Sequence, residues 1–184
     1  MNSTSNFLFK EEFSDGKYRV LSLTDGESNF RRIVCEKPAI CLIPFDTNPE
    51  GKIKNVYLAR YMDYFTGEHG HTCITVESKE QFDSDFEEVE DICKVELKIN
   101  CDVNEVYYLG KVNVSLPFSR QIKCYAINLD NHSRDLTGFT LDVDDSENKM
   151  YILDRVRFTR VLNGEIEDST CLSAAMLLTS YINQ

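Results

Sequence analysis

Charged residues recur at helical spacing between Ser84 and Asn100, where they could support metal chemistry. Glu87, Glu90 and Asp91 stand at positions i, i+3 and i+4, so a helix would place all three carboxylates on one face. Carboxylate oxygens are the ligands that Mg²⁺ prefers, which makes this triplet a candidate metal site. The alternative is a solvated acidic first turn, and we favour it because acidic residues are common at helix starts.

Two lysines on the same predicted helix suggest a second chemistry. Lys94 and Lys98 could hold a diphosphate directly, with Arg60 of an earlier strand assisting. The alternative is an ordinary surface on which Glu90 pairs with Lys94 at the favoured i, i+4 spacing. We consider the ordinary surface the better interpretation, and phosphate binding stays open.

The stretch that carries these residues has start and stop signals of a helix. Ser84 is the predicted N-cap, and Glu87 three residues later completes a capping-box pattern. Asn100 is predicted to take the left-handed conformation that ends the helix.

The remaining elements alternate between strands and helices, which predicts an α/β domain layered around a mixed sheet. The run Pro38–Phe45 should be a strand buried on both faces, and the apolar helix Ser169–Ile182 should be buried nearly all round. Asp168 or Ser169 should cap that helix. Further strands are predicted at 18–23, 30–35, 54–62, 72–76, 105–115, 121–129 and 150–153, a further helix at 154–162, a loop at 66–70, and a polar acidic segment at 130–148.

Composition limits the classes of function. A chain of 184 residues with 42% hydrophobic residues can form one domain with its own core. Its formal net charge of −11 disfavours nucleic acid and anionic membranes as partners. None of the seven cysteines has CxxC spacing, so we expect buried thiols in a reducing cytoplasm, not a zinc site or a disulfide framework.

Four segments together resemble the Nudix hydrolase family, in particular its ADP-ribose pyrophosphatase branch. They are CEKPAICLIPFD, NVYLARYMDYFTGEHG, DVNEVYYLGKVNVS and NGEIEDSTCLSAAMLL, and they follow the family's order and spacing. The resemblance implies an α/β/α sandwich around a mixed β-sheet. It also implies an N-terminal β extension over residues 1–36, packed on or exchanged with a Nudix-like domain over residues 37–184.

The family's signature, G-x5-E-x7-R-E-U-x-E-E-x-G-U with U aliphatic, is largely replaced here. The strong match after the helix sets the register, in which Val95 keeps its aliphatic class and Asp85 keeps a charge. The two Gly positions fall on Lys79 and Asn100, the Arg on Cys93, and the three later Glu on Lys94, Leu97 and Lys98.

These replacements determine the expected function. In the family the three glutamates hold divalent metals against a diphosphate, whereas an ammonium group has no lone pair to donate. We therefore expect a catalytically inactive Nudix-like domain without a cofactor, acting as a structural or interaction module with protein partners or copies of itself. Since divergent Nudix-like chains also occur among tailed phages, a virion component is included in this expectation. The alternatives are an ADP-ribose-like binding pseudoenzyme and an active Mg²⁺-dependent hydrolase.

Overall fold

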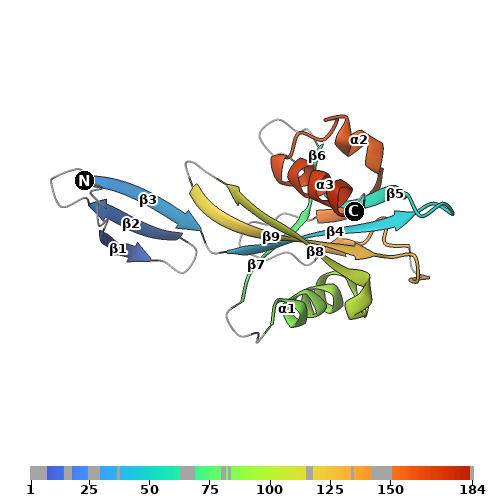
Figure 1. Cartoon of the computed structure of the whole chain (residues 1–184), viewed down its shortest axis with the longest axis horizontal. Coiled ribbons are helices and arrows are strands. Elements are labelled where there is room, and N and C mark those ends of the chain that lie inside the picture. The colour runs from blue at the N-terminus through green and yellow to red at the C-terminus, as the bar shows by residue number, and fades with distance from the viewer. Residues whose placement is uncertain are drawn as a thin grey trace, which may run out of the picture.

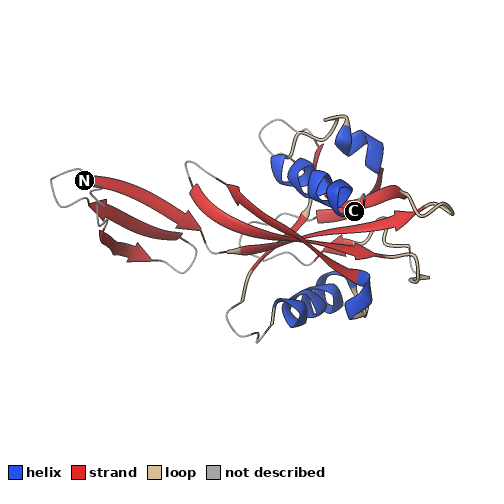
Figure 2. Ribbon diagram, in the orientation of Figure 1, coloured by secondary structure: helices blue, strands red, loops and turns tan. Residues whose placement is uncertain are grey.

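A mixed β-sheet forms the centre of the computed structural model, with α1 on one side and α2 and α3 on the other (Figures 1 and 2). This is the expected α/β/α arrangement. Within the described residues no helix is long and apolar enough to cross a membrane. The structure describes residues 8–14, 18–24, 30–36, 38–62, 69–79, 82, 84–114, 118–133, 135–141 and 151–182.

The N-terminal part forms a three-stranded antiparallel unit, drawn in blue in Figure 1. Its strands are β1 (Leu8–Ser14), β2 (Tyr18–Thr24) and β3 (Phe30–Glu36). β3 joins the main sheet through a short parallel pairing with β9. The two predicted strands are confirmed, and β1 was not predicted. A register shift within β1 breaks the alternation of apolar and polar residues by which a strand is recognised.

The main sheet is built around β4 (Ala39–Thr47), which pairs in parallel with β9 (Phe118–Asn128) and antiparallel with β5 (Ile53–Met62). β11 (Tyr151–Arg157) follows β5 in the sheet. The smaller or outer strands are β6 (His69–Thr72), β7 (Ile74–Glu77), β8 (Val106–Val114) and β10 (Thr140–Leu141).

The two faces of the sheet bury separate apolar clusters. Successive side chains of a strand point to opposite faces, so β4 gives Cys41 and Ile43 to one cluster and Ile40 and Leu42 to the other. The first cluster packs under α2 (Phe158–Leu162) and α3 (Ser169–Ile182). The second packs under α1 (Asp85–Ile92). The prediction that the strand beginning at Pro38 is buried on both faces is confirmed.

Three predictions of secondary structure are wrong in part. The segment 154–162 is strand up to Arg157, because it pairs with β5 and alternates Leu153 and Val156 between the two faces. His69 and Gly70 lie in β6 and not in a loop. Helix α3 is capped by Asp168 as expected, but its outer side is exposed. The acidic run 142–147 lies outside the described residues.

Candidate functional site

The start of α1 has the predicted cap and one buried acid that was not predicted. The Ser84 hydroxyl accepts a hydrogen bond from the Glu87 backbone N–H. Glu88 is only 4% exposed. Its carboxylate accepts from the Ser78 hydroxyl at 2.9 Å and from the Lys79 backbone N–H. Glu88 therefore ties residues 78–79 to the helix, and its i, i+4 spacing to the buried Ile92 places it on the sheet-facing side.

The end of the helix differs from the prediction. After Ile92 the chain makes a wide π-helical turn over Cys93–Leu97, and Lys98 takes the left-handed conformation with φ of 53°. The C-cap prediction for Asn100 is therefore wrong by two residues. Leu97, Ile99 and Cys101 are all buried, and this alternation requires extended backbone from residue 99 onward.

Leu97 occupies the core. It is fully buried, and it belongs to one apolar cluster with Leu136, Leu141 and Leu153. Cys93 is buried in the same cluster. Within the described residues, the position that the resemblance gives to a metal-binding glutamate is therefore part of the apolar core under α1. Val95, which keeps the family's aliphatic class, faces solvent instead.

The segment that follows β9 is held by polar contacts at its start. The Asp130 carboxylate accepts from the backbone N–H of Thr47 at 2.8 Å and from its hydroxyl at 2.7 Å. His132 contacts Glu105 at 3.1 Å, and the backbone N–H of Asp102 lowers the pKa of Glu105. These contacts fix the chain just after β9, and Leu136 and Leu141 farther along belong to the same apolar cluster as Leu97.

The exposed residues of the helix form lysine–carboxylate pairs. Lys94 Nζ lies 2.7 Å from the Glu90 carboxylate, which raises the pKa of Lys94. Lys79 Nζ lies 3.3 Å from Asp91, and Glu87 is exposed. In the described part of the chain, no group of three or more His, Cys, Asp or Glu side chains is placed to hold a metal ion. Glu87, Glu90 and Asp91 therefore do not converge on one point.

Asp85, the one position that keeps the charge of the family's first glutamate, anchors the helix to the sheet. Its carboxylate contacts Lys123 Nζ at 2.5 Å and accepts from the Tyr125 hydroxyl at 3.0 Å. The hydrogen bond from Lys123 lowers the pKa of Asp85. Both partners belong to β9, so this acid is engaged in a tie between helix and strand.

Arg60 lies away from the two lysines. It shares a face of β5 with Val56 and Leu58, whose cluster packs under α2 and α3, whereas α1 packs on the other face. Its Nε lies 3.3 Å from the Asp154 carboxylate, which also contacts His71 at 3.0 Å. The structure thus does not bring Arg60 together with Lys94 and Lys98.

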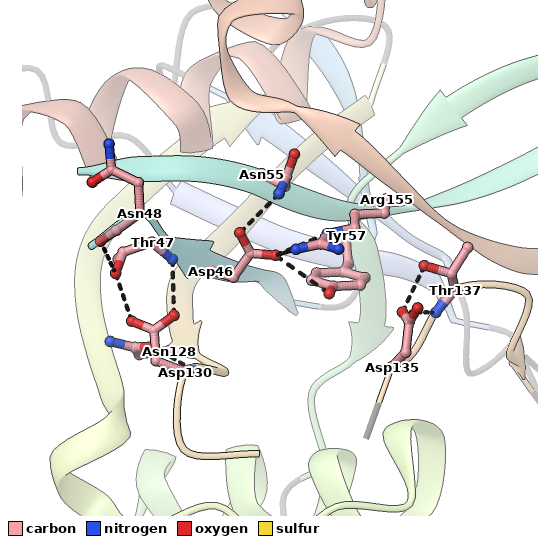
Figure 3. A network of polar contacts seen from close by, with 10 residues as sticks. All are labelled: Asp46, Thr47, Asn48, Asn55, Tyr57, Asn128, Asp130, Asp135, Thr137 and Arg155. Carbon is pink, nitrogen blue, oxygen red and sulfur yellow. Dashed lines mark hydrogen bonds and ion pairs between the residues drawn. The ribbon is translucent and has the colours of Figure 1, made fainter. Parts of the chain in front are cut away.

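A polar network lies on the α1 side of the sheet, and the sequence interpretation missed it (Figure 3). Asp46 is 9% exposed and accepts from Arg155 Nε at 2.9 Å and Nη2 at 2.6 Å. The Asn55 amide and the Tyr57 hydroxyl donate to the same carboxylate at 2.8 and 3.4 Å. Burial raises the pKa of Tyr57 to about 12. The Asp46 carboxylate accepts hydrogen bonds from β5 and β11, so it anchors β4 to these two strands. The sequence feature that could have revealed it is a charged residue directly after the apolar run 38–45.

Solved structures contain the same arrangement of sheet and helices. One, described as an ADP compounds hydrolase, matches 100% of this chain and 97% of its own length, with a TM-score of 0.61 and 14% identity. A NUDIX hydrolase from Listeria monocytogenes matches 80% of this chain and 95% of its own, with a TM-score of 0.56 and 15% identity. The chain has the Nudix fold. No protein-family model and no curated protein matches the sequence.

The Nudix fold implies a divalent metal, and the residues present do not fit one. The positions that the resemblance gives to metal-binding glutamates hold Lys94, Leu97 and Lys98. Two of these side chains are cationic and one is a core leucine, whereas Mg²⁺ needs oxygen ligands. No metal-dependent step is therefore derived for this chain.

Proposed function

We propose that this chain is a catalytically inactive Nudix-like domain that serves as a structural or interaction module in a larger assembly. The observation that carries the proposal is the complete burial of Leu97 in an apolar cluster. In an active Nudix enzyme this position would present a carboxylate to metal and diphosphate. Here it contributes to the stability of the fold.

The contacts of the helix support this proposal. A site for Mg²⁺ would need Glu90 and Asp91 released from Lys94 and Lys79, and it would need the two lysines turned away from the ion. Each ammonium group repels a divalent cation at close range. An active hydrolase built on the acidic first turn is therefore the least supported of the three alternatives.

The pseudoenzyme alternative has less support than the structural role. A diphosphate bound by Lys94 and Lys98 would lack help from Arg60, which lies on the other face of the sheet. It would also compete with Glu90 for Lys94. Leu97 between the two lysines is turned into the core.

The N-terminal unit suits a role in assembly. Strands β1 to β3 extend from one end of the domain, and among the described residues β1 pairs only with β2 (Figure 1). A sheet edge of this kind can pair with another chain. We include in the proposal that residues 1–36 bind a neighbouring copy or protein, and a virion is one such setting.

An activity measurement tests the proposal. The protein is incubated with ADP-ribose and Mg²⁺, and AMP is quantified by chromatography. We expect no AMP above the level of buffer alone. Release of AMP that is lost in the Glu90→Gln variant would overturn the proposal. Calorimetry with ADP-ribose in the absence of metal tests the pseudoenzyme: heat that disappears in Lys94→Ala would favour it, and no heat would count against it.

A further inference from the structure

Six of the seven cysteines have described side chains, and all six are buried as free thiols. Four of them belong to the apolar cluster under α2 and α3, namely Cys41, Cys73, Cys124 and Cys171. A single buried thiol packs like a small hydrophobic side chain, whereas two adjacent thiols can also be oxidised to a disulfide. The distances between these thiols therefore decide whether the cluster can do more than pack.

Two of the four thiols, those of Cys73 and Cys171, are in contact. Their Sγ atoms lie 3.1 Å apart, although the residues are 98 positions apart in the sequence. The two sulfur atoms need to approach by about 1 Å to reach bonding distance. Cys73 lies between β6 and β7, and Cys171 lies in the first turn of α3. A bond between them would thus join the sheet to the helix that covers it.

A polar tie holds the same two segments together. The carboxylate of Asp168, the cap of α3, accepts hydrogen bonds from the Cys171 backbone N–H at 2.6 Å and from the Thr72 hydroxyl at 3.1 Å. Thr72 and Cys73 are neighbours in the chain, so this carboxylate bridges the two segments that carry the thiols. The contact between the sulfur atoms is therefore supported by hydrogen bonds as well as by packing.

The other two thiols of the cluster have less freedom to move. Cys41 and Cys124 lie opposite each other in the parallel pairing of β4 with β9, where ladder hydrogen bonds fix the backbone along Ala39–Phe45. Cys73 lies outside the strands that flank it, and Cys171 is near the start of a helix. Both can therefore shift by the distance that bond formation requires.

We propose that Cys73 and Cys171 form a redox-sensitive pair, which hydrogen peroxide oxidises to a disulfide that fixes α3 to the sheet. The peroxide first converts one thiol to a sulfenic acid and releases one water molecule. The second thiol then attacks the sulfenic sulfur, the S–S bond forms, and the hydroxyl group leaves as a second water molecule. Two electrons and two protons pass from the thiols to the peroxide. In a reducing compartment the pair stays as thiols.

Burial determines how fast this reaction runs. Cys73 is 1% exposed, and Cys171 is fully buried. The hydrogen bond with Cys171, together with burial, raises the pKa of the Cys73 thiol, whereas the thiolate is the reactive form. Oxidation should therefore follow the local opening of α3, and the disulfide should be protected from reductants while the protein is folded. This inference does not rest on catalytic inactivity, so the oxidation and activity measurements can fail separately.

Peptide mapping of the full chain after exposure to hydrogen peroxide tests the proposal. Trypsin places Cys73 and Cys171 in separate peptides, 61–79 and 161–184, that contain no other cysteine. We expect these peptides to be joined, with the mass of two hydrogen atoms lost. Cys171→Ala should give no joined peptides, whereas Cys41→Ala, the matched control from the same cluster, should give them as the wild type does. A wild type without this bond, or with a different pair of cysteines joined, would overturn the proposal.

Urea unfolding tests whether the bond fixes the fold. Oxidation of the wild type should lower the unfolding equilibrium constant by roughly 30- to 700-fold, because the bond closes a long loop of the unfolded chain. This gain should be absent in Cys171→Ala, and glutathione should reverse it only when urea is also present. An oxidised wild type that unfolds at the same urea concentration as the reduced protein would overturn the fixing role of the bond.

Discussion

Replacing Leu97 by glutamate restores the family's residue type and tests whether this position belongs to the core or to a metal site. If Leu97 is core, the Leu97→Glu variant should unfold easily and gain nothing from Mg²⁺. If the position faces an open site, the same change should be tolerated and should create a metal ligand. The first outcome is a loss of stability that Mg²⁺ does not restore, and the second is a stability that Mg²⁺ increases, so one variant separates them.

The magnitude follows from the burial of the side chain. Leu97 is fully buried, so its removal loses about 1.5–3 kcal/mol of burial free energy. A carboxyl group among Leu136, Leu141 and Leu153 adds a desolvation penalty of at least about 1–3 kcal/mol. The expected loss is therefore about 2.5–6 kcal/mol, which is a large part of the roughly 5–15 kcal/mol that stabilises a domain.

Urea unfolding followed by far-UV circular dichroism measures this loss, with and without Mg²⁺. Lys94→Glu is the matched control: it changes the same helix at an exposed position, loses one ion pair, and should change the free energy of unfolding by less than about 1 kcal/mol. A restored site would instead show Mg²⁺ stabilisation of about 2.7 kcal/mol at a hundredfold excess over Kd. A Leu97→Glu variant as stable as wild type and further stabilised by Mg²⁺ would refute the reasoning.

Three further predictions concern the anchors of the site. Lys98→Gly should raise the free energy of unfolding by about 0.5–1 kcal/mol, because Lys98 is left-handed, while Asn100→Gly should not; equal effects in urea unfolding would contradict the observed helix end. Asp46→Ala should lower the free energy of unfolding by about 2–3 kcal/mol, because Arg155 loses both of its hydrogen bonds to Asp46. A loss below about 0.5 kcal/mol would show that this network contributes little to stability. The pKa of Asp85 is lowered in the folded protein, so its stabilising contribution is present above its ordinary pKa of 3.8 and is lost as the pH falls through its pKa in the folded protein. Below pH 3.8 the urea midpoint should therefore fall less steeply with pH in Asp85→Asn than in the wild type. The same dependence of the midpoint on pH in both proteins would contradict this.

Much of the fold could be predicted from local sequence patterns. The run from Pro38 to Phe45 has the continuous apolar character of a doubly buried strand, and β4 is that strand. Ser84 has the side chain and the spacing of an N-cap, and its hydroxyl accepts the expected bond. These features depend on neighbouring residues only, which is why the pattern was sufficient.

The errors arose where tertiary pairing decided the structure. Residues 154–157 were expected to be helical, but pairing with β5 made them a strand. The helix end at Lys98 depends on the burial of Ile99 and Cys101 against the sheet, which a capping rule for Asn100 cannot include. Glu88 and Asp46 also escaped prediction, because their partners are distant in the sequence or are backbone groups of a loop.

The separation of Arg60 from the lysines shows the same limit at the candidate site. The sequence places all three residues in the segments that would flank a diphosphate. Only the alternation of β5, with Val56 and Leu58 packed under α2 and α3, determines which face Arg60 occupies. A candidate ligand set assembled from residue types therefore needs the pairing of the strands before its members can be placed together.

The most direct test of the proposal that α1 and the turn after it hold no metal is the addition of substoichiometric Mn²⁺ while backbone amide signals are recorded by NMR. Mn²⁺ substitutes for Mg²⁺ at oxygen sites and broadens the signals of nearby amides. The account predicts no selective broadening of the amides of Lys94, Leu97 and Lys98 relative to the rest of the domain. Selective loss of those three signals, reversed by excess Mg²⁺, would contradict it.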